Sequence, residues 1–354
     1  MASPIIDIPV KASTPYTVSI GSGLRHEAGS YLSALHAPCT VAVITDSNVA
    51  PLYLSDVTAS LEGSGFSTLS YVFPAGEASK NLTTYGKILE FLAENRLTRT
   101  DIILALGGGV TGDMAGFAAA SYLRGIPYLQ MPTTLLSAVD SSVGGKTAVD
   151  LAAGKNLVGA FKQPIAVLCD IETLNTLTDE VFYDGCAECI KYGVLQSENL
   201  LRIFETMDPH EHLSEIIAES VQIKADYVES DEFDTGMRRY LNLAHTLGHA
   251  IERCNNFKLM HGHAVAAGMV LITRIGEKKG ITEPGTADRL AAICARNELP
   301  VSTGFTPADL VDGALSDKKR KGDHIDLIIP ERLGKCMTDT VPVDTLEETI
   351  SLAY

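Results

Sequence analysis

The chain has 354 residues, of which 45% are hydrophobic and 20% charged, as in ordinary globular proteins. Its 44 acidic residues outnumber its 28 basic ones and give a net charge of −16, so the average surface would repel nucleic acid, although a small anion could bind where basic residues converge. The N-terminus lacks a signal-peptide pattern, no apolar run reaches membrane-spanning length, and the seven scattered cysteines fit reduced thiols, so we expect a cytoplasmic protein without a membrane partner.

The first half of the sequence alternates short β-branched runs with amphipathic stretches. The predicted strands are 5–10, 16–20, 40–45, 68–73, 102–106, 127–131 and 165–169. Helical periodicity occurs between them, for example over 82–94 and 110–123. This alternation predicts a mostly parallel sheet with helices on its faces.

The pattern changes after Asp170. Residues from about 178 to 316 have mainly helical periodicity, and 324–329 with 336–341 could form a late hairpin. We therefore predict an α/β, Rossmann-like nucleotide-binding domain over residues 1–175, followed by a mainly α-helical domain over residues 176–354.

A glycine loop follows the predicted strand 102–106. Gly107, Gly109 and Gly112 satisfy the pattern G-x-G-x-x-G between a strand and a helix, where backbone N–H groups can approach a pyrophosphate. The acidic residue expected about 20 positions later is missing, so Asp46, after the strand 40–45, is the candidate for binding the ribose. The alternative is a tight turn that binds nothing.

One carboxylate and several imidazoles are candidates for a metal site. They are Glu188 in CAECIKYG, His245 and His249 in HTLGH, and His261 and His263 in MHGHAVAAG. Two histidines and a carboxylate can hold zinc and leave positions open for a substrate, which suits Lewis-acid chemistry on hydroxyls. Structural histidines are the alternative interpretation. Cys186 and Cys189 form a lone C-x-x-C pair, which we interpret as packing residues.

A set of basic and amide residues stands next to glycines and small polar residues. Its members are Lys146, Lys155, Asn156, Lys224, Arg238, Arg239, Asn242, Lys318 and Lys319. Any single lysine would ordinarily be solvated, but the set has the composition expected around bound phosphate and carboxylate groups.

Taken together, these segments resemble the 3-dehydroquinate synthase family. The matching stretches include GGGVTGDMAGFAAASYLRGIPYLQMPTTLLSAVDSSVGGKTAVDLAAGKN, AECIKYG, RRYLNLAHTLGHAIE, HGHAVAAGM and SDKK, and they extend from about Asp46 to Lys318. The resemblance implies an NAD-binding domain, a helical metal- and substrate-binding domain with zinc or cobalt, and a homodimer. It implies conversion of 3-deoxy-arabino-heptulosonate 7-phosphate to 3-dehydroquinate and phosphate, in the shikimate pathway of aromatic amino acid biosynthesis.

The resemblance also implies roles for individual residues. The metal ligands would be Glu188, His245 and His261. NAD would contact Asp46, Asn48, Glu77, Lys80, Gly107, Gly108, Gly109, Val110, Asp113, Thr133, Thr134, Lys146, Lys155 and Thr176. The small anionic sugar-acid substrate would bind Arg124 (supplied across a dimer interface), Lys146, Lys155, Asn156, Lys224, Arg238, Asn242, His249 and Lys318. The residues acting in catalysis would be Asp140, Lys146, Lys191, Asn242 and His249.

Two positions depart from the family pattern. Asp234 replaces the glutamate of an E-x-G segment, and Ala244 replaces the glycine of LNLGH. Two related functions remain as alternatives: a sugar phosphate cyclase acting on a neutral heptulose or hexose phosphate, and an oxidoreductase similar to glycerol dehydrogenase that releases NADH. A catalytically inactive nucleotide-binding protein is a third.

Overall fold

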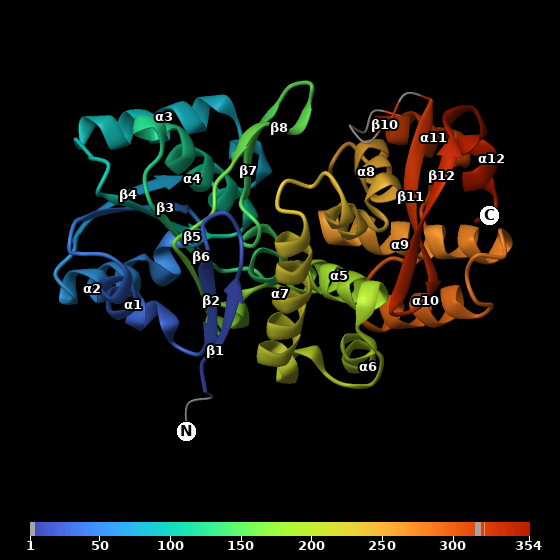
Figure 1. Cartoon of the computed structure of the whole chain (residues 1–354), viewed down its shortest axis with the longest axis horizontal. Coiled ribbons are helices and arrows are strands. Elements are labelled where there is room, and N and C mark those ends of the chain that lie inside the picture. The colour runs from blue at the N-terminus through green and yellow to red at the C-terminus, as the bar shows by residue number, and fades with distance from the viewer. Residues whose placement is uncertain (1–3, 316–319, 322) are drawn as a thin grey trace. The chain divides into compact units, whose positions relative to one another are not determined.

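The computed structural model describes residues 4–315, 320–321 and 323–354, which form two compact units (Figure 1). The first unit comprises Met1–Leu177 and Lys224–Phe233, and the second comprises Thr178–Ile223 and Asp234–Tyr354. Helix α7 (Leu213–Ser230) therefore contributes residues to both units. The single domain boundary predicted between residues 175 and 176 stays a prediction. The sequence contained no signal that residues 224–233 belong to the first unit.

A seven-stranded sheet forms the centre of the first unit. Its strand order is β1-β2-β9-β6-β5-β3-β4, and every neighbouring pair is parallel except β1 with β2. The strands are β1 (Ile6–Val10), β2 (Tyr16–Gly21), β3 (Thr40–Asp46), β4 (Ser67–Phe73), β5 (Ile102–Gly107), β6 (Tyr128–Pro132) and β9 (Ala166–Asp170). All seven strands predicted from the β-branched runs are present.

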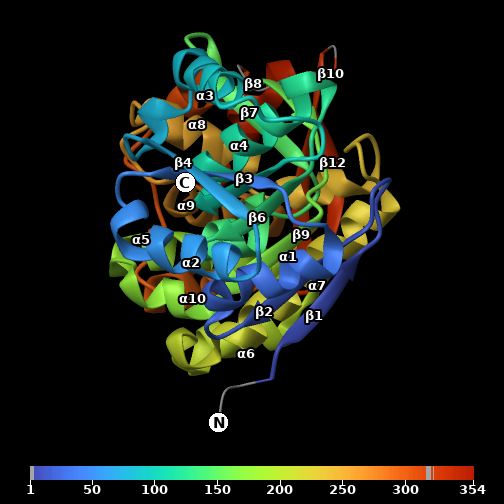
Figure 2. The same cartoon turned by 90° about the vertical axis from the view of Figure 1, so that its left-hand side faces the viewer.

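Helices cover both faces of this sheet (Figures 1 and 2). Val41 and Val43 of β3 point to the face covered by α1 (Ala28–Leu35) and α2 (Ser55–Gly63). Ala42 and Ile44 point to the opposite face, covered by α3 (Leu82–Glu94) and α4 (Gly109–Ser121). A strand that is covered on both faces has a continuous apolar sequence, and all six residues of β5 are buried.

The strand order reverses at β3, and this places the nucleotide-binding candidates together. The chain leaves β3 for β4 on one side and returns to β5 on the other side. Ligands of open α/β sheets bind beyond the carboxyl ends of the strands at such a reversal. Asp46 ends β3 and Gly107 ends β5, so both lie at this position.

An antiparallel hairpin of β7 (Lys146–Leu151) and β8 (Gly154–Phe161) was not predicted. Its sequence is interrupted by glycines and polar residues, and β8 buries none of its side chains fully, so it lacks an alternating hydrophobic pattern. Gly159 is required by close pairing, since a Cβ there would lie 2.0 Å from the Thr147 carbonyl oxygen.

The second unit is mainly helical, as predicted. Its helices are α5 (Asp179–Gln196), α6 (Glu198–Thr206), the first part of α7, α8 (His245–Cys254), α9 (His261–Lys278), α10 (Thr286–Arg296), α11 (Pro307–Leu315) and α12 (Leu346–Ser351). A small antiparallel sheet is formed by β10 (Arg320–Lys321), β11 (His324–Arg332) and β12 (Lys335–Pro342), the last two being the predicted late hairpin.

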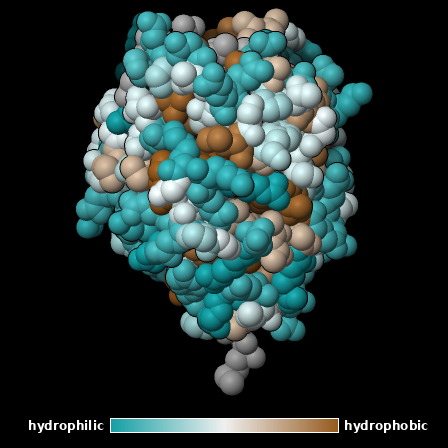
Figure 3. Space-filling view, turned by 90° about the vertical axis from the view of Figure 1, so that its right-hand side faces the viewer, coloured by the Kyte–Doolittle hydropathy of each residue, from teal (hydrophilic) through white to brown (hydrophobic). Residues whose placement is uncertain are grey.

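Helix α9 lies at the core of the second unit and packs against α5, α8 and α10. Glycines permit close contacts there; a Cβ at Gly268 would lie 2.8 Å from the carbonyl oxygen of Ala244. The face of this unit shown in Figure 3 is mainly hydrophilic, with scattered apolar residues between the polar ones. No helix in the described part of the chain has the length and apolar character needed to cross a membrane.

Candidate functional site

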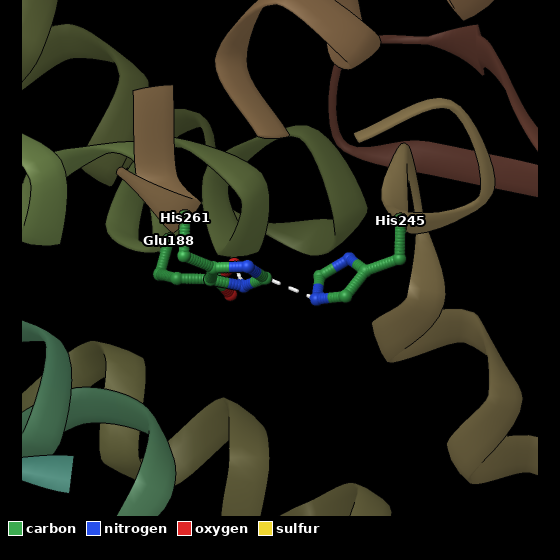
Figure 4. A group of neighbouring side chains, drawn as sticks. All are labelled: Glu188, His245 and His261. Atoms are coloured by element: carbon green, nitrogen blue, oxygen red, sulfur yellow. Dashed lines mark ion pairs between the residues drawn. The ribbon is translucent and has the colours of Figure 1, made fainter. Parts of the chain in front are cut away.

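Three predicted metal ligands converge within the second unit (Figure 4). Glu188 lies on α5, whereas His245 and His261 are the first residues of α8 and α9. The Nε2 atoms of His245 and His261 lie 3.7 and 3.6 Å from Oε1 of Glu188. Two ligands on one tetrahedral zinc ion are about 3.3 Å apart, because zinc–ligand bonds are about 2.0–2.1 Å long.

Both imidazole rings turn the same nitrogen toward Glu188. Nδ1 of His245 lies 3.0 Å from the carbonyl oxygen of Leu243, and Nδ1 of His261 lies 3.4 Å from Oε2 of Glu252. An acceptor at Nδ1 places the ring proton there and leaves the Nε2 lone pair available. Two nitrogen donors and one carboxylate oxygen, spaced in this way, fit a catalytic zinc or cobalt site.

Lys191 neutralises the other oxygen of the same carboxylate. It lies one turn after Glu188 on α5, and its ammonium group forms an ion pair with Oε2. The side chains are 1% and 0% exposed, so neither charge is compensated by bulk water. The carboxylate therefore has one oxygen facing a cation and one facing the two imidazoles.

The first turn of α9 is tied directly to α5. Oδ1 of Asp184 accepts the backbone N–H of His263 at 3.0 Å and lies 2.9 Å from its Nδ1. A Cβ at Gly262 would lie 1.8 Å from the Asp184 carbonyl oxygen, so only glycine permits this approach. Because Glu188 follows Asp184 by one turn of α5, the contact sets the distance from Glu188 to His261.

The electrostatics of His261 favour its protonated form when no metal is bound. Burial lowers the pKa of His261, but hydrogen bonds to Glu188 and Glu252 and their negative charges outweigh that effect and raise the pKa to about 10. A metal ion therefore has to displace a proton from this ring.

The remaining candidates of the second unit are Arg238, Asn242 and His249. Arg238 is 2% exposed and lies with half-buried Asn242 on the short helix Met237–Asn242. The ring of His249 lies 5.4 Å from that of His245 and 5.9 Å from that of His261. The predicted substrate residue Lys318, and its neighbour Lys319, lie outside the described residues.

In the first unit, the glycine loop joins β5 to α4 as predicted. A Cβ at Gly107 would lie 2.5 Å from Oγ1 of Thr111, so the loop requires glycine. The N–H of Thr133 donates to the carbonyl oxygen of Gly107, and no described side chain caps the N-terminus of α4. The N–H groups at the start of α4, which carries Val110, are thus available to an anion.

Asp46 is positioned by the backbone that follows it. Its Oδ1 accepts the N–H groups of Asn48 and Val49 at 2.8 and 3.1 Å, and its Oδ2 accepts the hydroxyl of Thr111 at 3.3 Å. Asp46 thereby links the end of β3 to the first turn of α4. Exposed Asn48 lies beside it.

Lys80 contacts one residue expected to bind NAD and one expected to bind the substrate. Its Nζ lies 2.6 Å from Asp113 and 2.6 Å from the side-chain oxygen of Asn156. Burial lowers the pKa of Lys80, but the adjacent carboxylates of Asp113 and Glu77 outweigh this effect and raise the pKa above its usual value. Lys155 lies 3.9 Å from Glu77 in a half-exposed ion pair.

In the same unit, buried Lys224 on α7 also contacts a candidate residue. Its Nζ donates to the carboxylate of Asp140 at 2.7 Å and to the carbonyl oxygen of the same residue at 2.5 Å. Lys146 and Arg124 are exposed, and Arg124, the last residue of the short 3₁₀ helix Tyr122–Arg124, has φ +69°. Thr134 N–H donates to Ser137.

Two residues that contact these candidates, Glu252 and Tyr53, were not identified from the sequence. Glu252 lies against His261, and its spacing of seven and three residues from His245 and His249 on one helix face was a usable signal. Tyr53, whose hydroxyl lies 2.5 Å from Oγ1 of Thr176, offered no comparable signal because it lies far from Thr176 in the sequence.

Comparisons with known proteins match most of the chain. Models of the 3-dehydroquinate synthase N-terminal and C-terminal regions match residues 70–184 and 185–320. A 3-dehydroquinate synthase from Streptococcus sanguinis (strain SK36) is 43% identical over 341 residues, covering 94% of this chain and 96% of that protein.

Two solved structures have the same fold. A 2-deoxy-scyllo-inosose synthase complexed with carbaglucose-6-phosphate, NAD+ and Co2+ superposes with a TM-score of 0.86 at 23% identity, covering 98% of this chain and 99% of that chain. A 2-epi-5-epi-valiolone synthase from Streptomyces hygroscopicus with NAD+ and Zn2+ bound has the same TM-score and coverage at 24% identity. At this identity the likeness establishes the fold alone.

The pKa of His261 predicts a pH-dependent affinity for zinc. Because Glu188 and Glu252 raise the pKa of His261 well above pH 7, zinc binding should release at least one proton at pH 7. The apparent affinity should rise between pH 6 and 9, and calorimetry in buffers of different ionisation enthalpy should count the protons. An affinity that stays constant over this range would contradict displacement of a proton from His261 by the metal.

The backbone of Ala244 predicts an unusual response to glycine. Ala244, between Leu243 and His245, has φ +66°, a conformation that costs about 1–2 kcal/mol in any residue with a Cβ. Ala250, in the middle of α8, is a matched control because it is also buried but helical. Ala244→Gly should therefore cost about 1–2 kcal/mol less stability than Ala250→Gly, as measured by chemical denaturation. Equal losses would show that Ala244 is not strained.

Proposed function

The chain belongs to the 3-dehydroquinate synthase family, and we propose that it converts 3-deoxy-arabino-heptulosonate 7-phosphate into 3-dehydroquinate and phosphate. The observation that carries this proposal is the convergence of Glu188, His245 and His261 beside a buried lysine, in a chain 43% identical to a 3-dehydroquinate synthase. The reaction makes a carbocycle from a phosphorylated sugar acid without net oxidation.

The residues of the second unit would act on the hydroxyls of the substrate. A zinc or cobalt ion held by Glu188, His245 and His261 supplies a Lewis acid for the C5 hydroxyl and its neighbour. Lys191, held by its ion pair with Glu188, can donate a hydrogen bond to one of these hydroxyls, and Asn242 and His249 would bind the same substrate.

The residues of the first unit would bind NAD and part of the substrate. The uncapped start of α4 and the glycine loop suit the pyrophosphate, and Asp46 offers a carboxylate at the strand-order reversal. Bound NAD supplies a reversible hydride acceptor for C5, so the C6 proton is acidic while C5 is a ketone.

The cations would hold the two anionic ends of the substrate. Lys224 and Arg238 would bind the carboxylate, whereas Lys146, Asn156, His249 and Lys318 would bind the phosphate. Held in this way, the phosphate can accept the C6 proton as its bond to C7 breaks, and Asp140 can hydrogen-bond to the C5 hydroxyl. Once C5 is an alcohol again, the held substrate would open its ring and C7 would form a bond to the C2 carbonyl carbon.

Similarity favours this reaction over the alternatives. The cyclases whose names point to other products are 23% and 24% identical to the chain, compared with 43% for the 3-dehydroquinate synthase. A dehydrogenase resembling glycerol dehydrogenase would not require the cations proposed for the phosphate.

We further propose that the enzyme is a cytoplasmic homodimer without nucleic-acid or membrane partners. Exposed Arg124 would reach the active site of the other subunit.

The proposed reaction predicts phosphate release without accumulation of NADH. Purified protein with zinc or cobalt, catalytic NAD and the heptulosonate phosphate should release one phosphate per product. The absorbance at 340 nm should show no steady rise, and chelation should abolish turnover until metal is restored. One NADH per product would instead identify a dehydrogenase.

Arg238 should determine the preference for an acidic substrate. A charge-assisted hydrogen bond contributes about 1.5–3 kcal/mol, so Arg238→Gln should lower kcat/KM for the heptulosonate phosphate by roughly tenfold to a hundredfold. Arg238→Lys should recover only part of the loss, because the guanidinium fork is missing. NAD and metal binding should be nearly unchanged.

The neighbouring Arg239 provides a matched control. Its side chain is 42% exposed and its guanidinium pairs with Asp326 at 3.0 Å, so Arg239→Gln should leave kcat/KM nearly unchanged. Sedoheptulose 7-phosphate, which lacks the carboxylate, should be a poor substrate for the wild type. If it is used as well as the acid, or if Arg238→Gln has no effect on the acid, the chain is a cyclase of another substrate.

A further inference from the structure

His261 lies between two buried carboxylates that face its two ring nitrogens. Nε2 lies 3.6 Å from Oε1 of Glu188, and Nδ1 lies 3.4 Å from Oε2 of Glu252. Glu188 comes from α5 and Glu252 from the last turns of α8, so the ring at the start of α9 is held from both sides. Glu252 itself is 3% exposed.

These contacts define two overlapping sets of potential ligands. One set is Glu188, His245 and His261, and the other is His249, Glu252 and His261. A single imidazole presents only one lone pair to a metal when its other nitrogen carries a proton. The orientation of His261 therefore decides which carboxylate is a ligand and which accepts the ring proton.

The neighbouring histidine resolves this choice in favour of Glu188. Nδ1 of His245 lies 3.0 Å from the Leu243 carbonyl oxygen, an acceptor without a proton of its own, so the Nε2 lone pair of His245 points toward Glu188. Glu188 is the carboxylate that both Nε2 atoms approach, at 3.7 and 3.6 Å. Glu252 would then accept the Nδ1–H of His261, as the Leu243 carbonyl oxygen accepts the Nδ1–H of His245.

We propose that Glu252 is a positioning residue of the metal site, which holds the Nδ1–H of His261 and directs its Nε2 toward the metal. The proposal rests on the assignment of Glu188, His245 and His261 as ligands. A carboxylate behind a ligating imidazole fixes the tautomer and orientation of the ring and increases its basicity. Loss of such a group typically costs about 10–100-fold in metal affinity.

The experiment measures zinc affinity, without substrate or NAD. Metal-stripped wild-type protein and the variants Glu252→Leu and Glu252→Gln are titrated with zinc against a chromophoric chelator. Glu252→Leu should weaken zinc binding about 10–100-fold, and Glu252→Gln should lose less, because its amide oxygen can still accept the Nδ1–H. Wild-type affinity in Glu252→Leu would overturn the proposal.

A double-mutant cycle separates positioning from general support of the fold. In a His261→Ala background, Glu252→Leu should cause no further loss of zinc affinity, because the group through which it acts is gone. Equal losses with and without His261 would show that Glu252 only supports the fold. The melting temperature of each metal-free variant shows whether Glu252→Leu still folds. If it does not, the milder substitution Glu252→Gln provides the test.

Three further variants distinguish the possible failures. Glu215→Gln removes a carboxylate facing another histidine, His212, in the same unit and should bind zinc like the wild type. His249→Ala should change zinc affinity by less than about threefold; a loss as large as that of His245→Ala would make the second set the ligands and overturn the proposal. If His245→Ala retains full affinity, the proposed metal ligands fail as well. If His245→Ala loses the metal but Glu252→Leu does not, only the role of Glu252 is refuted.

Discussion

The second unit is organised around one buried negative charge, the carboxylate of Glu188. A carboxylate removed from water costs several kcal/mol unless other groups compensate it, and Glu188 is 0% exposed. Lys191 compensates one oxygen from the same helix, and the two imidazoles approach the other. The need for these three partners constrains where α5, α8 and α9 can lie, because each contributes a side chain from a fixed turn. A divalent cation between the imidazoles and Glu188 would neutralise the remaining carboxylate charge. In the metal-free protein, a proton on His261 supplies positive charge at the same place.

Glycine residues and one strained backbone position allow the close approach of α5, α8 and α9 around Glu188. The start of α9 reaches α5 only because residue 262 has no Cβ, and α8 lies close to α9 at Gly268 for the same reason. Just before His245, the chain turns through a left-handed conformation at Ala244, although alanine is disfavoured there. That turn allows the Leu243 carbonyl to reach the ring two residues later. Local backbone strain is therefore tolerated next to His245, a proposed metal ligand, as is common at functional sites.

The parts of the fold that the sequence predicted correctly are those with strong local signals. Buried parallel strands such as β5 are continuous apolar runs, and the glycine loop has a fixed spacing, so both are recognisable without tertiary information. The hairpin β7–β8 lacks an alternating pattern, so it depends on contacts with the rest of its unit. The convergence of Glu188, His245 and His261 is a tertiary fact; spacing alone left structural histidines open, and resemblance to a family pointed to these three. Glu252 escaped notice because a glutamate on a helix is usually solvated; its spacing from His245 and His249 was a weak signal, and its burial against His261 is what distinguishes it.

The buried lysines share a property that explains how a chain of net charge −16 can hold an anionic substrate. Lys80 pairs with Asp113, Lys191 with Glu188 and Lys224 with Asp140, so each cation is compensated within its own unit before any ligand arrives. Compensation allows the ammonium groups to be buried without the full cost of desolvation. For Lys224, the lysine proposed to bind the substrate carboxylate, an incoming carboxylate then competes with Asp140, and its binding free energy is the difference between the two interactions. Because Asp140 fixes the position of the ammonium group, only an anion that reaches Lys224 in a matching geometry gains from the exchange.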